Sequence, residues 1–370
     1  MNIIDLFAGA GGLSLGATRA GFTVRAAVEL DKHAMETHRR NFPSTVHLAT
    51  DVSQLTGPEL LALSGMAGGE LDGLIGGPPC QGFSSIGNKD AGDMRNGLFA
   101  DFFRLVAQTQ PAFFVAENVP GILDSRYDDI RARALSQVPN GYRLLEPIEV
   151  EAQRYGAPTT RKRIFFIGYL PQRFSVELTR MHFAPPPNVE PAIVSSALHG
   201  LPSRIDCRWQ TEELGWRLAD APLGAFLADR ITNSVPAGVG DPRLVARYQE
   251  KGEVSGCLGT RHSDELRRRY RGLKYGEMDA VTRSRRLDPN GFCPTLRAGT
   301  GSDKGSFQAV RPIHYSSPRV ITPREAARLQ GFPDWFVFHA TKWHSFRQIG
   351  NSVSPIVAER VLTPLAQHLI

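Results

Sequence analysis

The stretch that decides the fold is Ile3-Ile-Asp5-Leu-Phe7-Ala-Gly9-Ala-Gly11-Gly12-Leu-Ser14. Its apolar start, Ile3–Phe7, predicts a first strand, and the glycine loop leads into a helix that runs to about Ala20. Glycines at such a turn let backbone amides approach a ligand and leave the helix N-terminus open. The dinucleotide fingerprint has a third glycine where Ser14 stands, so a nicotinamide cofactor is not favoured.

Short apolar runs alternate with amphipathic stretches through the first half of the chain. Further strands are predicted at Thr23–Val28, Leu71–Ile75, Ala112–Ala116 and Arg163–Tyr169, and helices at Leu98–Gln108, Thr322–Leu329 and Ser352–Leu369. This βαβ pattern predicts an α/β fold built on a parallel sheet.

Length and composition set limits on the class of protein. The chain has 370 residues, which suggests two domains at roughly 150 residues each, and it is 41% hydrophobic and 22% charged, enough for a sizeable core. No run approaches the roughly 18 apolar residues of a membrane span. The start, Met1–Asp5, has no basic region, so we expect no signal peptide. The four cysteines are scattered, which argues against a zinc site or disulfides; we expect a cytoplasmic protein with no metal.

Charge is divided unevenly along the chain. Residues 1–150 carry 12 Lys and Arg against 17 Asp and Glu, whereas residues 151–370 carry 31 against 20. The basic residues are densest at Arg261, Arg267, Arg268, Arg269, Arg271, Lys274, Arg283, Arg285 and Arg286. This stretch is either a solvated basic face or a surface for a polyanion, of which a phosphate backbone is the commonest.

Prolines break the pattern after Leu170, and turn-rich, basic sequence follows to about Pro318. Such texture is typical of a second domain that touches a partner through loops.

Two acidic residues follow predicted strands of the first half. Glu29 closes the second strand, where it can accept hydrogen bonds from ribose hydroxyls, and Asp51 is suited to the amine of adenine. With the glycine loop they favour an adenosine-containing ligand without a pyrophosphate. The alternative is a tight turn with incidental acids.

Two polar loops close neighbouring strands. Gly76-Gly-Pro-Pro-Cys80-Gln-Gly-Phe-Ser84 presents one thiol on a rigid diproline, and Glu117-Asn-Val-Pro120 follows Ala112–Ala116. In a parallel sheet both loops would lie at one edge, where ligands bind. A thiol beside a carboxylic acid suits addition to an electron-poor ring with protonation of a ring nitrogen. Otherwise Cys80 is a buried thiol and Glu117 a capping residue.

These motifs together resemble the DNA cytosine-5 methyltransferases, the prokaryotic restriction–modification type included. The resemblance rests on four motifs that occur in the family's order and span nearly the whole chain: DLFAGAGG at 5–12, GGPPCQGFS at 76–84, ENV at 117–119 and RQIGNSVSP at 347–355. Arg286–Arg297 also looks like a family motif. The resemblance implies a Rossmann-like, S-adenosyl-L-methionine-dependent domain formed by residues 1–171 and 320–370, and a smaller, irregular target-recognition domain at 172–319.

The resemblance also implies roles for individual residues. Cys80 matches the nucleophile that adds to carbon 6 of a flipped cytosine, and Glu117 matches the group that holds ring nitrogen 3 and the 4-amino group, a role that a raised pKa would help. Arg161 and Arg163 match two arginines near the flipped base, although Thr159 stands where a Gln is usual. Cofactor positions are matched by Phe7, Gly9, Gly11, Glu29, Leu30, Asp51, Val52, Pro79, Leu98, Asn351 and Ser352.

Further implications concern the DNA partner. Loop 82–97 has the composition of a lid, and Ile86 stands where the family has a residue that enters the gap left by the flipped base. Trp209 and Trp216 are expected in the core rather than stacked on bases. We expect a monomer that acts on double-stranded DNA, binds no membrane, and protects host DNA from a restriction endonuclease with which it forms no stable complex.

Two alternatives remain, the second of them from another class. A transfer-RNA cytosine methyltransferase shares the scaffold, but the long basic insert between Arg163 and Arg286 favours a reader of duplex DNA. A catalytically dead homologue would only bind DNA or protein, and the intact Cys80, Glu117 and Asn351 argue against it.

Overall fold

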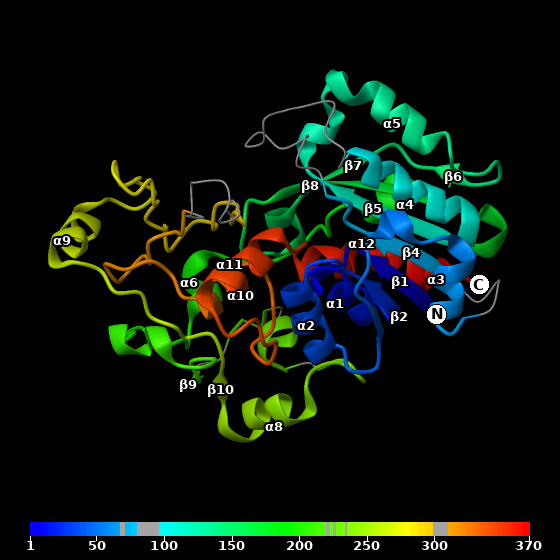
Figure 1. Cartoon of the computed structure of the whole chain (residues 1–370). Coiled ribbons are helices and arrows are strands. Elements are labelled where there is room, and N and C mark those ends of the chain that lie inside the picture. The colour runs from blue at the N-terminus through cyan, green and yellow to red at the C-terminus, as the bar shows by residue number, and fades with distance from the viewer. Residues whose placement is uncertain (67–70, 80–95, 220–222, 225–226, 234, 299–309) are drawn as a thin grey trace.

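The structure is a computed structural model that describes residues 1–66, 71–79, 96–219, 223–224, 227–233, 235–298 and 310–370. A central sheet carries the first half of the chain (Figure 1). Its strands are β1 Asn2–Leu6, β2 Thr23–Val28, β3 Val46–Leu48, β4 Gly73–Gly76, β5 Phe113–Asn118, β6 Arg143–Leu144, β7 Ile148–Glu151 and β8 Lys162–Tyr169. The helices are α1 Gly12–Arg19, α2 Lys32–Asn41, α3 Gly57–Leu63, α4 Asn96–Thr109, α5 Asp128–Leu135, α6 Val194–Leu198, α8 Pro242–Lys251, α9 Asp264–Gly272, α10 Pro323–Leu329, α11 Lys342–Asn351 and α12 Pro355–His368.

The strands run in the order β3-β2-β1-β4-β5-β8-β6, with β7 also paired to β8. The first five strands of the chain are parallel, as predicted, because helices cross between them. The strand predicted at Arg163–Tyr169 is confirmed as β8, but it runs antiparallel to β5, β6 and β7. The sheet is therefore mixed rather than parallel, since no α-helix crosses between β6, β7 and β8.

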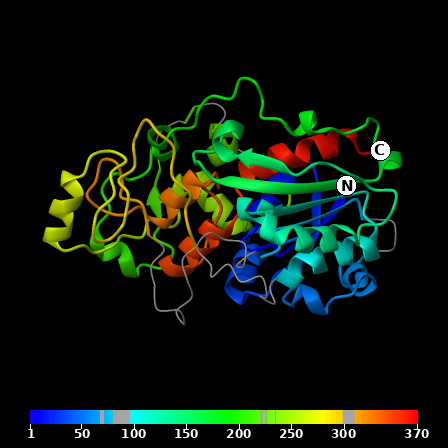
Figure 2. The ribbon, with the colours of Figure 1, turned by 90° about the horizontal axis from the view of Figure 1, so that it is seen from above.

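Helices cover both faces of the sheet. On one face α4 packs through Phe99, Phe102 and Phe103, which are fully buried together with Leu60 of α3. On the other face α1 and α12 lie side by side (Figures 1 and 2). A Cβ on Gly16 of α1 would lie only 2.2 Å from the Cβ of Ala358, so a glycine is needed for the two helices to approach this closely.

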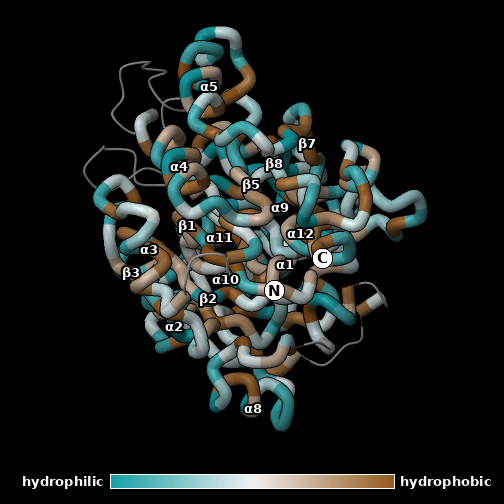
Figure 3. Tube along the Cα trace, turned by 90° about the vertical axis from the view of Figure 1, so that its right-hand side faces the viewer, coloured by the Kyte–Doolittle hydropathy of each residue, from teal (hydrophilic) through white to brown (hydrophobic). Residues whose placement is uncertain are grey.

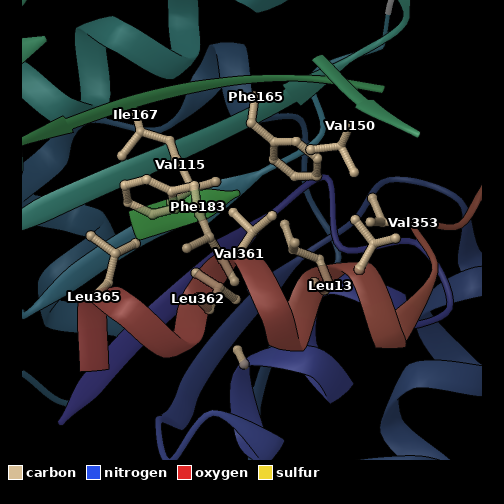
Figure 4. Packing of buried hydrophobic residues seen from close by; sticks show 14 of the residues in the cluster. Leu13, Val115, Val150, Phe165, Ile167, Phe183, Val353, Val361, Leu362 and Leu365 are labelled. Atoms are coloured by element: carbon tan, nitrogen blue, oxygen red, sulfur yellow. The ribbon is translucent and has the colours of Figure 1, made fainter. Parts of the chain in front are cut away.

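The last helix completes the core of the first half. Figure 4 shows Val361, Leu362 and Leu365 of α12 packed against Val115 of β5 and Phe165 of β8. Both ends of the chain lie on the same side of the molecule (Figure 3). The helices predicted at Thr322–Leu329 and Ser352–Leu369 are confirmed as α10 and α12, with Pro323 and Pro355 in their first turns.

The segment from Leu170 to about Pro318 has little regular structure, as predicted. Among its described residues, the α-helices are α6, α8 and α9, and the strands are the pair of β9 (Arg217–Leu218) and β10 (Glu253–Val254). Short 3₁₀ helices and a π-helix at Ala228–Asn233 complete its regular structure. Figure 1 places α9 at the end of the molecule away from the sheet. No helix in the described parts of the chain has the length and apolar character needed to cross a membrane.

Candidate active site

The loops that leave β1, β2, β3, β4 and β5 all lie at one edge of the sheet, here called the carboxyl edge. Strand β1 lies between β2 and β4, so the order of the strands reverses at this point. Open α/β sheets bind ligands at such a switch point, outside the carboxyl ends of the strands. Among the described residues, the predicted site residues Phe7, Gly9, Gly11, Glu29, Leu30, Asp51, Val52 and Pro79 follow these strands. Glu117 lies near the end of β5, and Leu98 is half-buried on α4.

The glycine loop after β1 has an unusual backbone. Phe7, Gly9 and Gly11 all have positive φ, at 57°, 57° and 100°. A Cβ on Gly11 would lie 2.4 Å from the ring of Phe42, whereas a Cβ on Gly9 would meet no atom of the described structure within 4 Å. Gly11 is therefore required by packing, while Gly9 faces open space that a ligand can occupy.

Glu29 is fixed by the glycine loop. Its Oε2 accepts a hydrogen bond from the backbone N–H of Gly9 at 2.9 Å, and its Oε1 accepts one from Asp31 at 2.7 Å. Burial raises the pKa of Glu29, and the two N–H groups partly oppose that rise. The next side chain, Leu30, is 64% exposed. A positioned carboxylate beside an exposed apolar group suits a ligand that has both hydroxyls and an apolar face.

Behind the loop, four side chains are linked by three successive hydrogen bonds, which were not predicted from the sequence. Ser14 Oγ donates to Asp5 Oδ2 at 2.6 Å, His38 Nε2 lies 3.0 Å from Ser14 Oγ, and His38 Nδ1 lies 2.9 Å from His47 Nε2. When the Ser14 hydroxyl donates to Asp5, a neutral His38 donates from Nε2 and accepts at Nδ1.

Burial shifts the pKa values of the titratable side chains in this hydrogen-bonded series. It raises the pKa of Asp5 to about 7, and it lowers the pKa of His38 well below its usual value. The pKa of His47 falls to about 4, again mainly through burial, with Arg39 adding to the effect. Only the position of Asp5 in the glycine motif could have indicated this series of hydrogen bonds, because His38 and His47 match no motif.

Glu117 and Arg163 meet at the carboxyl edge. Glu117 ends β5 and is 9% exposed, and its Oε1 lies 2.5 Å from Nε of Arg163 on β8. A Cβ on Gly77 would be 3.2 Å from Oε2 of Glu117, and Asn118 Nδ2 donates to the carbonyl of Pro78 at 3.4 Å. The diproline loop therefore starts beside Glu117, as the predicted sheet required. Cys80 and Ile86 lie outside the described residues.

Arg161 has a different environment from Arg163. It is buried, and its guanidinium donates to the carbonyls of Leu296 at 3.1 Å and Asn351 at 3.4 Å. It therefore links the 286–297 segment to the end of α11. Arg161 and Arg163 both line a hollow of about 190 Å³, a volume that includes open solvent.

The C-terminal segment reaches the glycine loop across more than 300 positions of sequence. A Cβ on Gly12 would lie 2.2 Å from the carbonyl oxygen of Val353 and 3.2 Å from the Cβ of Ser352. Ser352 is buried, and its Oγ donates to the carbonyl of Gln348 at 2.7 Å. Asn351 is exposed at the end of α11. The structure thus brings these two predicted cofactor residues to the carboxyl edge.

Asp51 and Val52 follow β3. Asp51 caps a short 3₁₀ helix by accepting from Ser53 N–H at 2.9 Å, and Val52 is buried. Pro79 is half-buried at the last described position of its loop.

The expectation that Trp209 and Trp216 are core residues is wrong. Both side chains are only half-buried, and each carries a guanidinium over its ring: Arg217 lies 3.5 Å from the Trp209 centroid and Arg247 lies 4.3 Å from that of Trp216. Each ring therefore packs against a guanidinium rather than in the apolar core.

Exposed basic side chains gather on and around α9. This set, here called the basic face, consists of Arg261, Arg267, Arg268, Arg271, Lys274, Arg283 and Arg285. Arg269 is instead held by Asp279 at 2.9 Å, and Arg286 donates to backbone carbonyls.

Comparison with known proteins agrees with this geometry. Residues 1–367 match the family described as C-5 cytosine-specific DNA methylase. The chain is 38% identical to the Type II methyltransferase M.XorII of Xanthomonas oryzae pv. oryzae, with 97% of this chain and 82% of the relative covered. It is 34% identical to the Type II methyltransferase M.DdeI of Desulfomicrobium norvegicum, with 97% and 87% covered.

Solved structures show the same relationship. A crystal structure described as a DNA modification methyltransferase encoded within a prophage of E. coli superposes with a TM-score of 0.88 at 49% identity, covering 99% of both chains. The Dnmt2 methyltransferase of S. pombe shares the fold at a TM-score of 0.61 and 16% identity, covering 99% of this chain and 98% of that one. The chain therefore belongs to the C-5 cytosine-specific DNA methylase family, the DNA (cytosine-5)-methyltransferases.

Proposed function

We propose that the protein transfers a methyl group from S-adenosyl-L-methionine to carbon 5 of a cytosine flipped out of duplex DNA, through a transient bond between Cys80 and carbon 6. One observation carries the proposal. Glu117, Arg163 and the start of the diproline loop meet at the carboxyl edge, where Glu29 and the glycine loop also lie.

The residues at the carboxyl edge fit the proposed cofactor. Glu29 offers carboxylate oxygens for ribose hydroxyls, Leu30 offers an exposed apolar side chain, and Gly9 leaves open space beside the loop. Phe7, Gly11, Asp51, Val52, Pro79, Leu98, Asn351 and Ser352 complete the set we propose. The bound cofactor supplies an electrophilic methyl group, and no metal is needed for that step.

The Cys80 thiolate adds to carbon 6 because carbon 5 of an intact cytosine is too weak a nucleophile. The electrons of the carbon 5–carbon 6 double bond then make carbon 5 nucleophilic, and it would take the methyl group from the sulfonium sulfur of the cofactor. That sulfur keeps the electrons of the broken bond and leaves as the thioether S-adenosyl-L-homocysteine. Transfer of the carbon 5 proton to solvent restores the double bond and expels the Cys80 sulfur as a thiolate. The target base has to leave the helix for this attack, since its carbon 6 is shielded inside a duplex.

Glu117 holds the Watson–Crick edge of the base in this scheme. A carboxylate can accept from the 4-amino group, but it has to be protonated to donate to ring nitrogen 3. Arg163 orients the carboxyl group through the 2.5 Å ion pair. Arg161 positions the site indirectly, because it holds the Leu296 and Asn351 carbonyls.

Residues 172–319 are proposed to recognise DNA, and residues 1–171 with 320–370 to form the catalytic domain. The basic face supports this division, since phosphate contacts set the register on a duplex while a few side chains read base edges. The enzyme would act as a cytoplasmic monomer that protects host DNA in a restriction–modification system, in which the endonuclease is a separate protein.

Bisulfite sequencing of a plasmid from an expressing, methylation-free host tests this function. We expect complete modification of one cytosine in a short recurring DNA sequence, and no methyl transfer to transfer RNA in vitro. Methylation of transfer RNA with an unmodified plasmid would instead favour the transfer-RNA enzyme. An inactive protein that still binds duplex DNA would favour the dead homologue.

A further inference from the structure

Three histidines from separate parts of the chain lie together outside the carboxyl edge. His33 belongs to α2, His339 to the loop between α10 and α11, and His344 to α11. One ring nitrogen of each lies within 4.8 Å of those of the other two. The ring centroids are 3.9 Å apart for His33 and His344, 4.4 Å for His339 and His344, and 4.9 Å for His33 and His339.

The backbone around these rings is held in place by hydrogen bonds. Gln348 Nε2 donates to the carbonyl of His33 at 2.9 Å, and Gln348 Oε1 accepts from the N–H of His339 at 3.3 Å. Ser345 Oγ donates to the carbonyl of His339 at 2.5 Å. Asp31 and Arg347 form an ion pair at 3.2 Å between the same two elements. The segments that carry the rings are thus fixed, and the rings are left to adjust by side-chain rotation.

The distances suit a divalent transition metal after a small adjustment. Zinc binds histidine nitrogen at about 2.0–2.1 Å, which places two ligands of a tetrahedron about 3.4 Å apart. The nitrogens here lie within 4.8 Å of one another, so rotations of the half-buried rings have to bring them closer by at most about 1.4 Å.

The donor set selects the class of metal. Three imidazoles suit zinc, copper, nickel or cobalt, whereas magnesium and calcium prefer oxygen. The nearby carboxylate of Asp31 is already used, because Oδ1 caps α2 through the N–H groups of His33 and Ala34 and Oδ2 pairs with Arg347. Asp31 is therefore not offered as the fourth ligand, and that position is open to solvent.

His339 has a partner for its second ring nitrogen. Its Nδ1 lies 3.1 Å from Thr341 Oγ1 and accepts from the N–H of Thr341 at 3.0 Å. Binding a metal through Nε2 moves the ring proton to Nδ1, where the Thr341 hydroxyl can accept it. Metal-ligating histidines commonly donate their other N–H in this way. The Thr341 N–H then loses its present acceptor, which weakens the site.

We propose that His33, His339 and His344 bind one divalent transition metal ion, zinc first, and so connect α2 to α11. This revises the expectation of no metal, which rested on the scattered cysteines; the histidines gave no pattern because 306 positions separate the second from the first. The ion takes no part in methyl transfer. It joins the segment that follows Glu29 to the helix that ends at Asn351.

Zinc titration of the full chain by calorimetry tests the proposal. All proteins carry Cys207→Ser, because Cys207 is the exposed thiol among the described cysteines and could bind zinc itself. We expect one zinc ion per chain at micromolar free metal, and loss of at least tenfold in affinity in each of His33→Gln, His339→Gln and His344→Gln. His199→Gln, at an exposed histidine elsewhere, is the matched control and should bind as the parent does.

Two further measurements separate binding from misfolding. Without metal, the variants should unfold at the same temperature as the parent, and zinc should raise the midpoint only where the three histidines are intact. Cobalt should give the visible absorption of a four-coordinate site in the parent and in His199→Gln, but not in His33→Gln, His339→Gln or His344→Gln. A parent that binds no zinc at micromolar free metal, or a triple variant that binds it as well as the parent, would overturn the proposal.

Discussion

Glu117 and Arg163 form an ion pair across neighbouring strands, with Oε1 of the acid 2.5 Å from Nε of the guanidinium. The antiparallel pairing of β5 and β8 creates it, because Glu117 pairs with Phe165 and brings Arg163 to the end of β5. Both side chains are largely buried. The guanidinium thus lies beside the carboxylate that we propose holds the flipped cytosine.

Replacement of the acid should slow the chemical step. Glu117→Gln keeps the shape of the side chain but cannot donate a proton to ring nitrogen 3, so methyl transfer should fall by roughly 10²–10⁴-fold. Single-turnover methylation measures this rate without product release. A rate equal to that of the wild type would remove Glu117 from the mechanism.

Arg163 should be energetically coupled to Glu117. If the arginine acts by orienting the acid, Arg163→Ala should slow methyl transfer, but should have little further effect in the Glu117→Gln background. A double-mutant cycle on single-turnover rates should give a coupling of about 0.5–3 kcal/mol. Lys162→Ala is the control, because the neighbouring Lys162 pairs with Glu151 instead. Additive effects of Arg163→Ala and Glu117→Gln would contradict this role.

Glu29 should control cofactor affinity. Glu29→Gln loses the charge that would accept ribose hydroxyls and one acceptor for the N–H groups of Gly9 and Asp31. Hydrogen bonds to charged groups contribute about 1.5–3 kcal/mol, so affinity for S-adenosyl-L-methionine should fall roughly 10- to 100-fold. Calorimetry measures it, with the exposed Glu59→Gln as control. Unchanged binding would place the ribose elsewhere.

Asp5 should make stability depend on pH. Its folded pKa of about 7 lies above the ordinary value of 3.8, so the folded state binds the proton more tightly. Stability from this proton is complete below pH 3.8 and is lost as the pH rises through about 7. Asp5→Asn removes the effect while keeping an acceptor for Ser14.

Urea unfolding at a series of pH values measures this difference. The stability of the wild type relative to Asp5→Asn should fall by at most about 4 kcal/mol between pH 4 and pH 8. The low pKa values of His38 and His47 act in the opposite direction in both proteins and largely cancel in the comparison. Asp129→Asn, at an exposed aspartate, should show no such trend. A pH-independent difference for Asp5→Asn would mean that Asp5 keeps an ordinary pKa.

The basic face should determine the salt dependence of DNA binding. Arg268→Ala with Arg271→Ala should weaken binding to all duplexes alike and reduce the slope of log affinity against log salt by about two. Arg126→Ala, at an exposed arginine paired with Asp124, is the matched control. Fluorescence anisotropy at several salt concentrations measures the slope, and an unchanged slope would place the duplex elsewhere.

The sequence predicted the sheet through its strongest local patterns. Thr23–Val28 matches β2 residue for residue, and Pro323 and Pro355 marked the starts of α10 and α12. Short or polar elements were missed: β3 has three residues, and α2 and α11 carry many polar side chains whose packing partners are distant in sequence. Hydrophobic periodicity is weak in such elements.

The sequence predicted those parts of the candidate site that lie in family motifs. The contact of Ser352 with the glycine loop followed from a family motif, since no local pattern joins positions 12 and 352. The Glu117–Arg163 pair could not be predicted, because it depends on the antiparallel direction of β8. The hydrogen bonds that join Asp5 to His47, and the grouping of the three histidines, result from tertiary packing alone.

The most direct test of the account uses duplex DNA in which 5-fluorocytosine replaces the methylated base. Fluorine cannot leave carbon 5 as the proton does, so sulfur that has added to carbon 6 cannot be expelled. We predict a complex stable to denaturation, which carries one methyl group and maps to Cys80 by peptide mass spectrometry. Cys80→Ser should bind the same DNA without forming it. Methylation of the normal duplex with no adduct from the fluorinated one, or an adduct at another residue, would contradict the account.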